Sequence, residues 1–88
     1  MELEEQTTTI RPHLVTVHVN DRPVNLAGPK RAGLEIKEAA VNQGVPIQLD
    51  FALSELLPNG GTRAVGNSDE VTVTKESRFT AIDVDDNS

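Results

Sequence analysis

The sequence predicts a small α+β domain in which a mixed sheet of four to five strands packs on one helix. One observation is that only residues 32–44 combine helix-forming composition with a clear stop signal. The other is that the segments on both sides alternate between apolar and polar residues, as β-strands do. With 88 residues there is room for one domain with a thin core.

The helix is predicted from residues 32–44, AGLEIKEAAVNQG, which contain no β-branched run. Gly44 suits a left-handed cap and a proline follows two residues later, so the helix should end near Gln43. No Ser, Thr, Asp or Asn precedes the helix to accept from its first amides, so we expect a frayed first turn. Ile36 and Ala40 share one face, and we expect both to be buried.

The first two strands are predicted to form a hairpin. Residues 14–20 place three valines on one face and Thr16 and His18 on the other. The sequence Asn-Asp-Arg-Pro then supplies a turn, and residues 23–26 resume the alternation. Because the proline has no amide donor, it fits only an edge strand or the start of a strand. Lys30 and Arg31 then lead into the helix.

A third strand is predicted after the helix, over residues 47–54. Its inward positions would be Ile47, Leu49, Phe51 and Leu53. A helix over residues 51–57 is the competing interpretation, because that stretch contains Ala, Leu, Ser and Glu.

The rest of the chain predicts short strands separated by turns. We expect a loop at residues 58–61, a short strand at 62–65, a turn at 66–69, an extended piece at 70–74 and a last strand at 78–84. Phe79 and Ala81 should face inward on the last strand, which can return beside the first strand in parallel through a long connection. This arrangement, with the helix crossing the hairpin, is the β-grasp plan.

Several stretches, taken in order, resemble a known family. Residues 19–24 (VNDRPV), 33–37 (GLEIK), 69–73 (DEVTV) and 78–81 (RFTA) resemble the bacterial multiubiquitin family of ubiquitin-like domains. The resemblance covers about residues 15–84 and implies a ubiquitin-like β-grasp fold. It also implies a protein modifier that is joined to protein targets and handled by an activating enzyme, a conjugating enzyme and a JAB-type peptidase.

The resemblance places the chemistry at the conjugation tail, formed by Asp85, Asp86, Asn87 and Ser88. In ubiquitin-like modifiers the terminal carboxylate is adenylated and passed to an amine, and a diglycine end suits the narrow enzyme channel. This tail has no glycine. Either a peptidase trims it, or the partner enzymes accept another residue, or conjugation does not occur. Gly60-Gly61 is no substitute, because cleavage there would remove the last strand.

Charge and composition narrow the partners. The net charge is −6, with three glutamates and one arginine before His13 and three aspartates after Ile82, so the middle is nearly neutral. We expect residues 1–12 to be a disordered leader, residues 13–84 the domain, and residues 85–88 a flexible tail. No basic patch with aromatics is present, so no nucleic acid partner is expected. The chain has no cysteine and no membrane segment, and we expect a monomer in the cytoplasm without membrane contact.

The residue types do not predict an enzyme, and no catalytic residue, cofactor or metal site is expected. His13 and His18 have opposite strand parity, and no serine has a visible base. The exposed sheet face offers a partner-binding surface of Thr16, His18, Thr80 and Ile82. The alternative function is therefore a non-covalent β-grasp adaptor that uses this face, and a sulfur carrier is a third hypothesis.

Overall fold

The computed structural model describes residues 13–84. The leader predicted at residues 1–12 and the tail predicted at 85–88 lie outside the described residues. The elements in chain order are β1 (His13–Val19), β2 (Arg22–Gly28), β3 (Lys30–Ala32), α2 (Gly33–Asn42), β4 (Ala52–Leu56), β5 (Thr62–Val65), β6 (Glu70–Thr72) and β7 (Arg78–Ile82).

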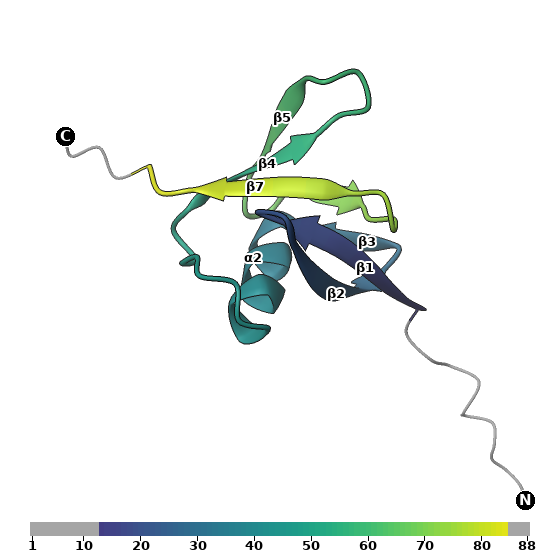
Figure 1. The fold of residues 1–88 in the computed structure, drawn as a ribbon, viewed down its shortest axis with the longest axis horizontal. Coiled ribbons are helices and arrows are strands. Elements are labelled where there is room, and N and C mark those ends of the chain that lie inside the picture. The colour runs from purple at the N-terminus through teal and green to yellow at the C-terminus, as the bar shows by residue number, and fades with distance from the viewer. Residues whose placement is uncertain (1–12, 85–88) are drawn as a thin grey trace, which may run out of the picture.

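Five of the strands form one mixed sheet in the order β2-β1-β7-β4-β5. β7 runs parallel to β1, and the other neighbours are antiparallel. The predicted α+β class, with a mixed sheet packed on one helix, is confirmed, and so is the parallel return of the last strand. Figure 1 shows α2 on one side of this sheet and the β4–β5 hairpin at the opposite end of the molecule.

The β1–β2 hairpin has a two-residue turn. Asn20 and Asp21 have φ values of 52° and 67°, the left-handed conformation that a tight hairpin needs at both positions and that Asn and Asp tolerate. Pro23 lies on β2 opposite His18 of β1. β2 is an edge strand, which agrees with the prediction from the missing amide of the proline. The side chain of Asn20 also extends the pairing with β7, because its Oδ1 accepts from the Ala81 amide (2.9 Å) and its Nδ2 donates to the Ala81 carbonyl (3.1 Å).

The core lies between the helix and the inner face of the sheet. Phe79 is its largest fully buried side chain, and the predicted inward residues of β1, β2 and β7 are all buried. The buried apolar residues are Val15, Val17, Val19, Val24, Leu26, Ile36, Ala40, Val45, Ile47, Leu53, Val65, Val71, Val73, Phe79 and Ala81. Their burial removes the alternating apolar faces from water, which is the main stabilising term for a domain of this size.

The end of α2 agrees with the prediction, and its start does not. Gln43 caps the helix and Gly44 follows with a φ of 94°. The frayed first turn was a wrong prediction, because distant turn carbonyls accept from the helix amides. The Gly33 amide donates to the Asp69 carbonyl (2.9 Å), and the following amide donates to the Asn67 carbonyl (3.1 Å). The amide just before the helix donates to the carboxylate of Glu35 (2.8 Å).

The third strand begins later than predicted. β4 starts at Ala52, and Leu49 is 44% exposed instead of facing the core. Val45 and Ile47 are buried, but they belong to a connection that covers the core without pairing into the sheet. The competing helix over residues 51–57 is also wrong, because β4 pairs with β5 on one side and β7 on the other.

A second, two-stranded ladder was missed at Lys30 and Arg31. These residues belong to β3, which pairs with β6 in antiparallel register, Lys30 opposite Thr72 and Ala32 opposite Glu70. The ladder fixes the turn at residues 66–69 beside the start of α2. β6 and β7 are also shorter than the predicted segments 70–74 and 78–84.

Candidate functional site

The predicted partner-binding face is an outward face of two neighbouring strands, β1 and β7. His18 lies opposite Arg78 in the parallel register. Thr16 comes two residues earlier on β1, and Thr80 and Ile82 follow on β7. Since alternate residues share a face, all four predicted residues point away from the helix.

These four residues lie along a diagonal line and do not cluster. From Thr16 to Ile82 the register advances six residues, about 20 Å at about 3.3 Å per residue. Thr16 is exposed, and its Oγ1 donates to Asn25 Oδ1 (2.7 Å) on the edge strand. His18 and Thr80 are half-buried, while Ile82 is 54% exposed. Ile82 is therefore the apolar end of this line.

Sequence reasoning missed the β4 contribution to this face. Thr80 lies opposite Ser54 and Ile82 opposite Ala52, so small side chains flank the predicted residues. Leu56, which is 40% exposed, lies opposite Arg78 at the other end of β4. The alternation of residues 52, 54 and 56 was visible in the sequence, but it indicated this face only once the boundaries of β4 were fixed.

Arg78 lies on the outward face between His18 of β1 and Leu56 of β4. Its Nη1 lies 3.8 Å from Asp21 Oδ1 in the hairpin turn, and both side chains are largely exposed. Exposed ion pairs of this kind contribute about 0–1 kcal/mol, so this pair is a minor restraint on the turn.

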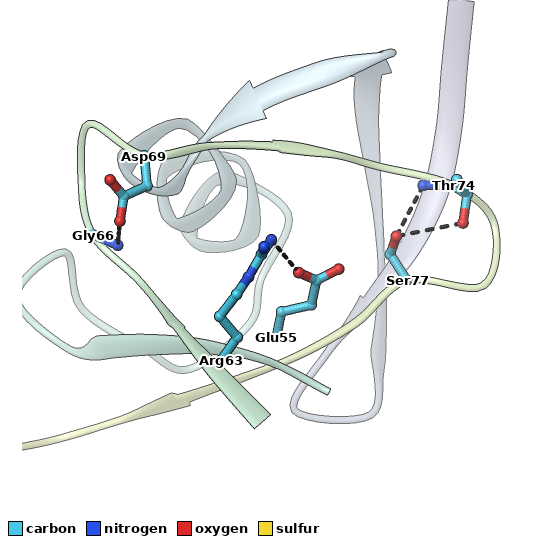
Figure 2. A network of polar contacts seen from close by, with 6 residues as sticks. All are labelled: Glu55, Arg63, Gly66, Asp69, Thr74 and Ser77. Carbon is cyan, nitrogen blue, oxygen red and sulfur yellow. Dashed lines mark hydrogen bonds and ion pairs between the residues drawn. The ribbon is translucent and has the colours of Figure 1, made fainter. Parts of the chain in front are cut away.

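A second polar region lies on the helix side of the sheet, at the β4–β5 end (Figure 2). Arg63 Nη2 donates to Glu55 Oε1 (2.8 Å), and the Glu55 side chain is only 16% exposed. On one side of this pair Asp69 Oδ2 accepts from the Gly66 amide (2.8 Å). The charge of Glu55 is thus compensated by one partner, and the pair holds the two strands in register.

The loop before β7 is closed by its own hydroxyls. Ser77 Oγ accepts from the Thr74 amide (2.9 Å), and Thr74 Oγ1 accepts from the Glu76 amide (3.1 Å). Ser77 is 8% exposed, and its carbonyl accepts from the His18 amide (3.1 Å), which starts the β1–β7 pairing. These hydroxyls therefore have structural roles in the loop.

Neither a cluster of metal ligands nor a helix able to cross a membrane is found within the described residues. Within residues 13–84 no group of three or more His, Asp or Glu side chains gathers as a metal site. No helix in the same part of the chain is long and apolar enough to cross a membrane. The predicted conjugation tail, Asp85, Asp86, Asn87 and Ser88, lies outside the described residues.

Comparisons with known proteins do not identify a relative. Neither the family models nor the curated proteins nor the solved structures searched contain a match to this chain. A function for the chain must therefore be argued from its sequence and geometry.

Proposed function

We propose that this protein is a ubiquitin-like modifier with a β-grasp fold, joined to target proteins through its C-terminal tail. The observation that supports it best is the sheet order β2-β1-β7-β4-β5, with parallel β1 and β7 at its centre and α2 on one face. This is the arrangement that the sequence resemblance to multiubiquitin domains implies.

The path of the last strand also supports the proposal. β7 ends at Ile82, and the chain then leaves the sheet (Figure 1). Val84 is 54% exposed. A reactive carboxylate attached beyond this point can enter an enzyme channel without unfolding the sheet, which is what adenylation of a modifier requires.

The partners follow from the same proposal. An activating enzyme would adenylate the tail, a conjugating enzyme would pass it to an amine of a target, and a JAB-type peptidase would trim or release it. Such a pathway operates in the cytoplasm, where ATP is available.

Reconstitution tests this function. The full chain is incubated with ATP and the proteins encoded by the genes that flank its own, and intact masses are measured. The proposal predicts a trimmed chain, an adenylate or a higher-mass conjugate. A variant lacking residues 85–88 has no such residues for the peptidase to remove, so it shows whether activation takes place without trimming. Unchanged mass in every reaction would count against conjugation.

A non-covalent adaptor is the second candidate, favoured by the exposed Ile82 and Leu56 on the outward sheet face. Comparing two variants separates it from the modifier. If the chain is an adaptor, Ile82→Asp abolishes partner binding, while deletion of residues 85–88 leaves it intact. If the chain is a modifier, the deletion changes conjugation: it abolishes conjugation where the tail itself is joined to targets, and it makes the peptidase unnecessary where these residues are trimmed first.

A further inference from the structure

The two edges of the five-stranded sheet differ in what they offer to another chain. β2 and β5 are the edge strands, and an edge strand carries unpaired amide and carbonyl groups that can template a further strand. The backbone groups at each edge therefore show where strand addition can take place.

The β2 edge is closed at two positions. The side-chain amide of Gln43 pairs with both backbone groups of Asn25, because the Asn25 amide donates to Gln43 Oε1 (2.9 Å) and Gln43 Nε2 donates to the Asn25 carbonyl (2.8 Å). This is the donor and acceptor pattern that an incoming strand would provide. Two residues earlier, Pro23 has no amide to offer. An added strand would have to displace Gln43 and would still find a donor missing.

The β5 edge is open. The Leu57 amide donates to the Gly61 carbonyl (2.8 Å), so these residues form a hydrogen-bonded pair at the hairpin end. In an antiparallel ladder, hydrogen-bonded pairs alternate with non-hydrogen-bonded pairs. The backbone groups of Arg63 and Val65 are therefore directed toward β4, and those of Thr62 and Ala64 point outward. Among the described residues, no strand pairs with this outer side.

An acidic groove lies next to this edge, between β5 and the start of β6. It has a volume of about 240 Å³ and is lined by Arg63, Ala64, Val65, Asp69, Glu70 and Val71. Glu55 neutralises the charge of Arg63, since its Oε1 lies 2.8 Å from Arg63 Nη2. Asp69 and Glu70 are exposed, and one Asp69 oxygen accepts from the Gly66 amide. The carboxylates therefore leave the groove with a negative charge.

We propose that the β5 edge binds an extended segment of a partner protein that carries a basic side chain, by strand addition. The backbone of the segment pairs with Thr62 and Ala64. Its side chains alternate between the two faces, and those on the side of Arg63 and Val65 point into the groove. A lysine or arginine at that position meets Asp69 and Glu70. This binding is independent of conjugation through the tail.

The test uses the full chain, labelled for NMR, and a capped hexapeptide of alternating valine and threonine with one lysine. The peptide is expected to shift the amide signals of Thr62, Ala64 and Glu70 and to slow hydrogen exchange at Thr62 and Ala64. A glutamate in place of the lysine should weaken binding about two- to fivefold, as expected for one exposed ion pair.

Two variants locate the site. Ala64→Pro removes the outward donor without removing a β4–β5 bond, and it should weaken binding at least about tenfold. Glu70→Gln should weaken binding of the lysine peptide about two- to fivefold, whereas Glu76→Gln, an exposed acid elsewhere, should leave it unchanged. N-methylation of the peptide amides should abolish binding to the unaltered protein, an arm that does not depend on how Ala64→Pro folds.

Three outcomes would overturn the proposal. The first is that the signals of Asn25 and its β2 neighbours move in place of the β5 signals. The second is that N-methylated and unmodified peptides bind equally. The third is that the β5 signals shift with protein concentration alone, which would make the occupant a second copy of this chain.

Discussion

Ile36 and Ile82 carry the same side chain in opposite surroundings, with exposed fractions of 0% and 54%. Truncation to valine should therefore separate the two. Ile36→Val is expected to lower the free energy of unfolding by about 0.5–1.5 kcal/mol, because it leaves a gap in the core. Ile82→Val should change it by less than about 0.5 kcal/mol. Urea unfolding measures both, and equal losses would contradict the assignment of Ile82 to the outward face.

The three lysines should react at different rates with an amine reagent. Lys37 is 4% exposed, and its Nζ donates to the Phe51 carbonyl (2.8 Å), which ties α2 to the connection before β4. Lys30 and Lys75 are exposed. Brief acetylation followed by peptide mass analysis should modify Lys30 and Lys75 first. Early modification of Lys37 in the folded protein would show that the helix does not bury it.

Gly33 should resist replacement although it lies in a helix. A Cβ there would overlap the Gly66 carbonyl oxygen and lie 3.0 Å from Val65 Cγ1. Gly33→Ala should thus lower the unfolding free energy by about 1–3 kcal/mol, although alanine is preferred in helices by about 1 kcal/mol. The control is Gly61→Ala, whose Cβ meets only a side-chain oxygen of Asn59 at 3.2 Å. A stabilising Gly33→Ala would contradict the close contact.

At the residue scale, most of the buried residues could be predicted from the alternation of apolar and polar residues along each strand. The valines of β1 and Phe79 of β7 alternate with polar residues. In a half-buried strand, a shift by one residue would turn these apolar side chains to the solvent, so the pattern fixes which residues face the core. Leu49 misled the same reasoning, because residues 47–53 alternate just as a strand does. Their connection follows a different path to cover the core, and parity alone contains no information about that path.

Among the elements, β2 shows how a helix end can protect a sheet edge. Gln43→Ala removes both hydrogen bonds to Asn25 and should speed hydrogen exchange of the Asn25 amide about fivefold, equivalent to about 1 kcal/mol. Gln48→Ala, at an exposed glutamine, is the matched control and should leave that amide unchanged. If exchange at Asn25 were the same in both variants, the Gln43 contact would not guard this edge.

The missed and displaced elements share a physical cause. β3 has three residues, of which two are charged, so it shows no apolar alternation and exists because β6 lies beside it. The start of α2 is capped by carbonyls at residues 67 and 69, more than thirty residues away along the chain. Long-range partners of this kind leave no local signal, whereas the end of α2 was predictable because Gly44 acts locally.

For the whole molecule, the candidate site was predictable only in part. Strand parity placed Thr16, His18, Thr80 and Ile82 on the outward face, but their spread along a diagonal depends on the parallel register of β1 and β7. The open β5 edge and its acidic groove arise from the sheet order and the turn at residues 66–69. Neither could be derived from the local sequence of β5.

We propose that the C-terminal tail of this α+β domain becomes bonded to other proteins. The direct measurement is purification of the N-terminally tagged full chain from its own host under denaturing conditions, followed by peptide mass spectrometry. Conjugation predicts target lysines that carry a remnant of the C-terminal residues after Arg78, or of a trimmed form, through an isopeptide bond. Recovery of the chain with a free terminal carboxylate throughout, and with no branched peptide, would contradict it.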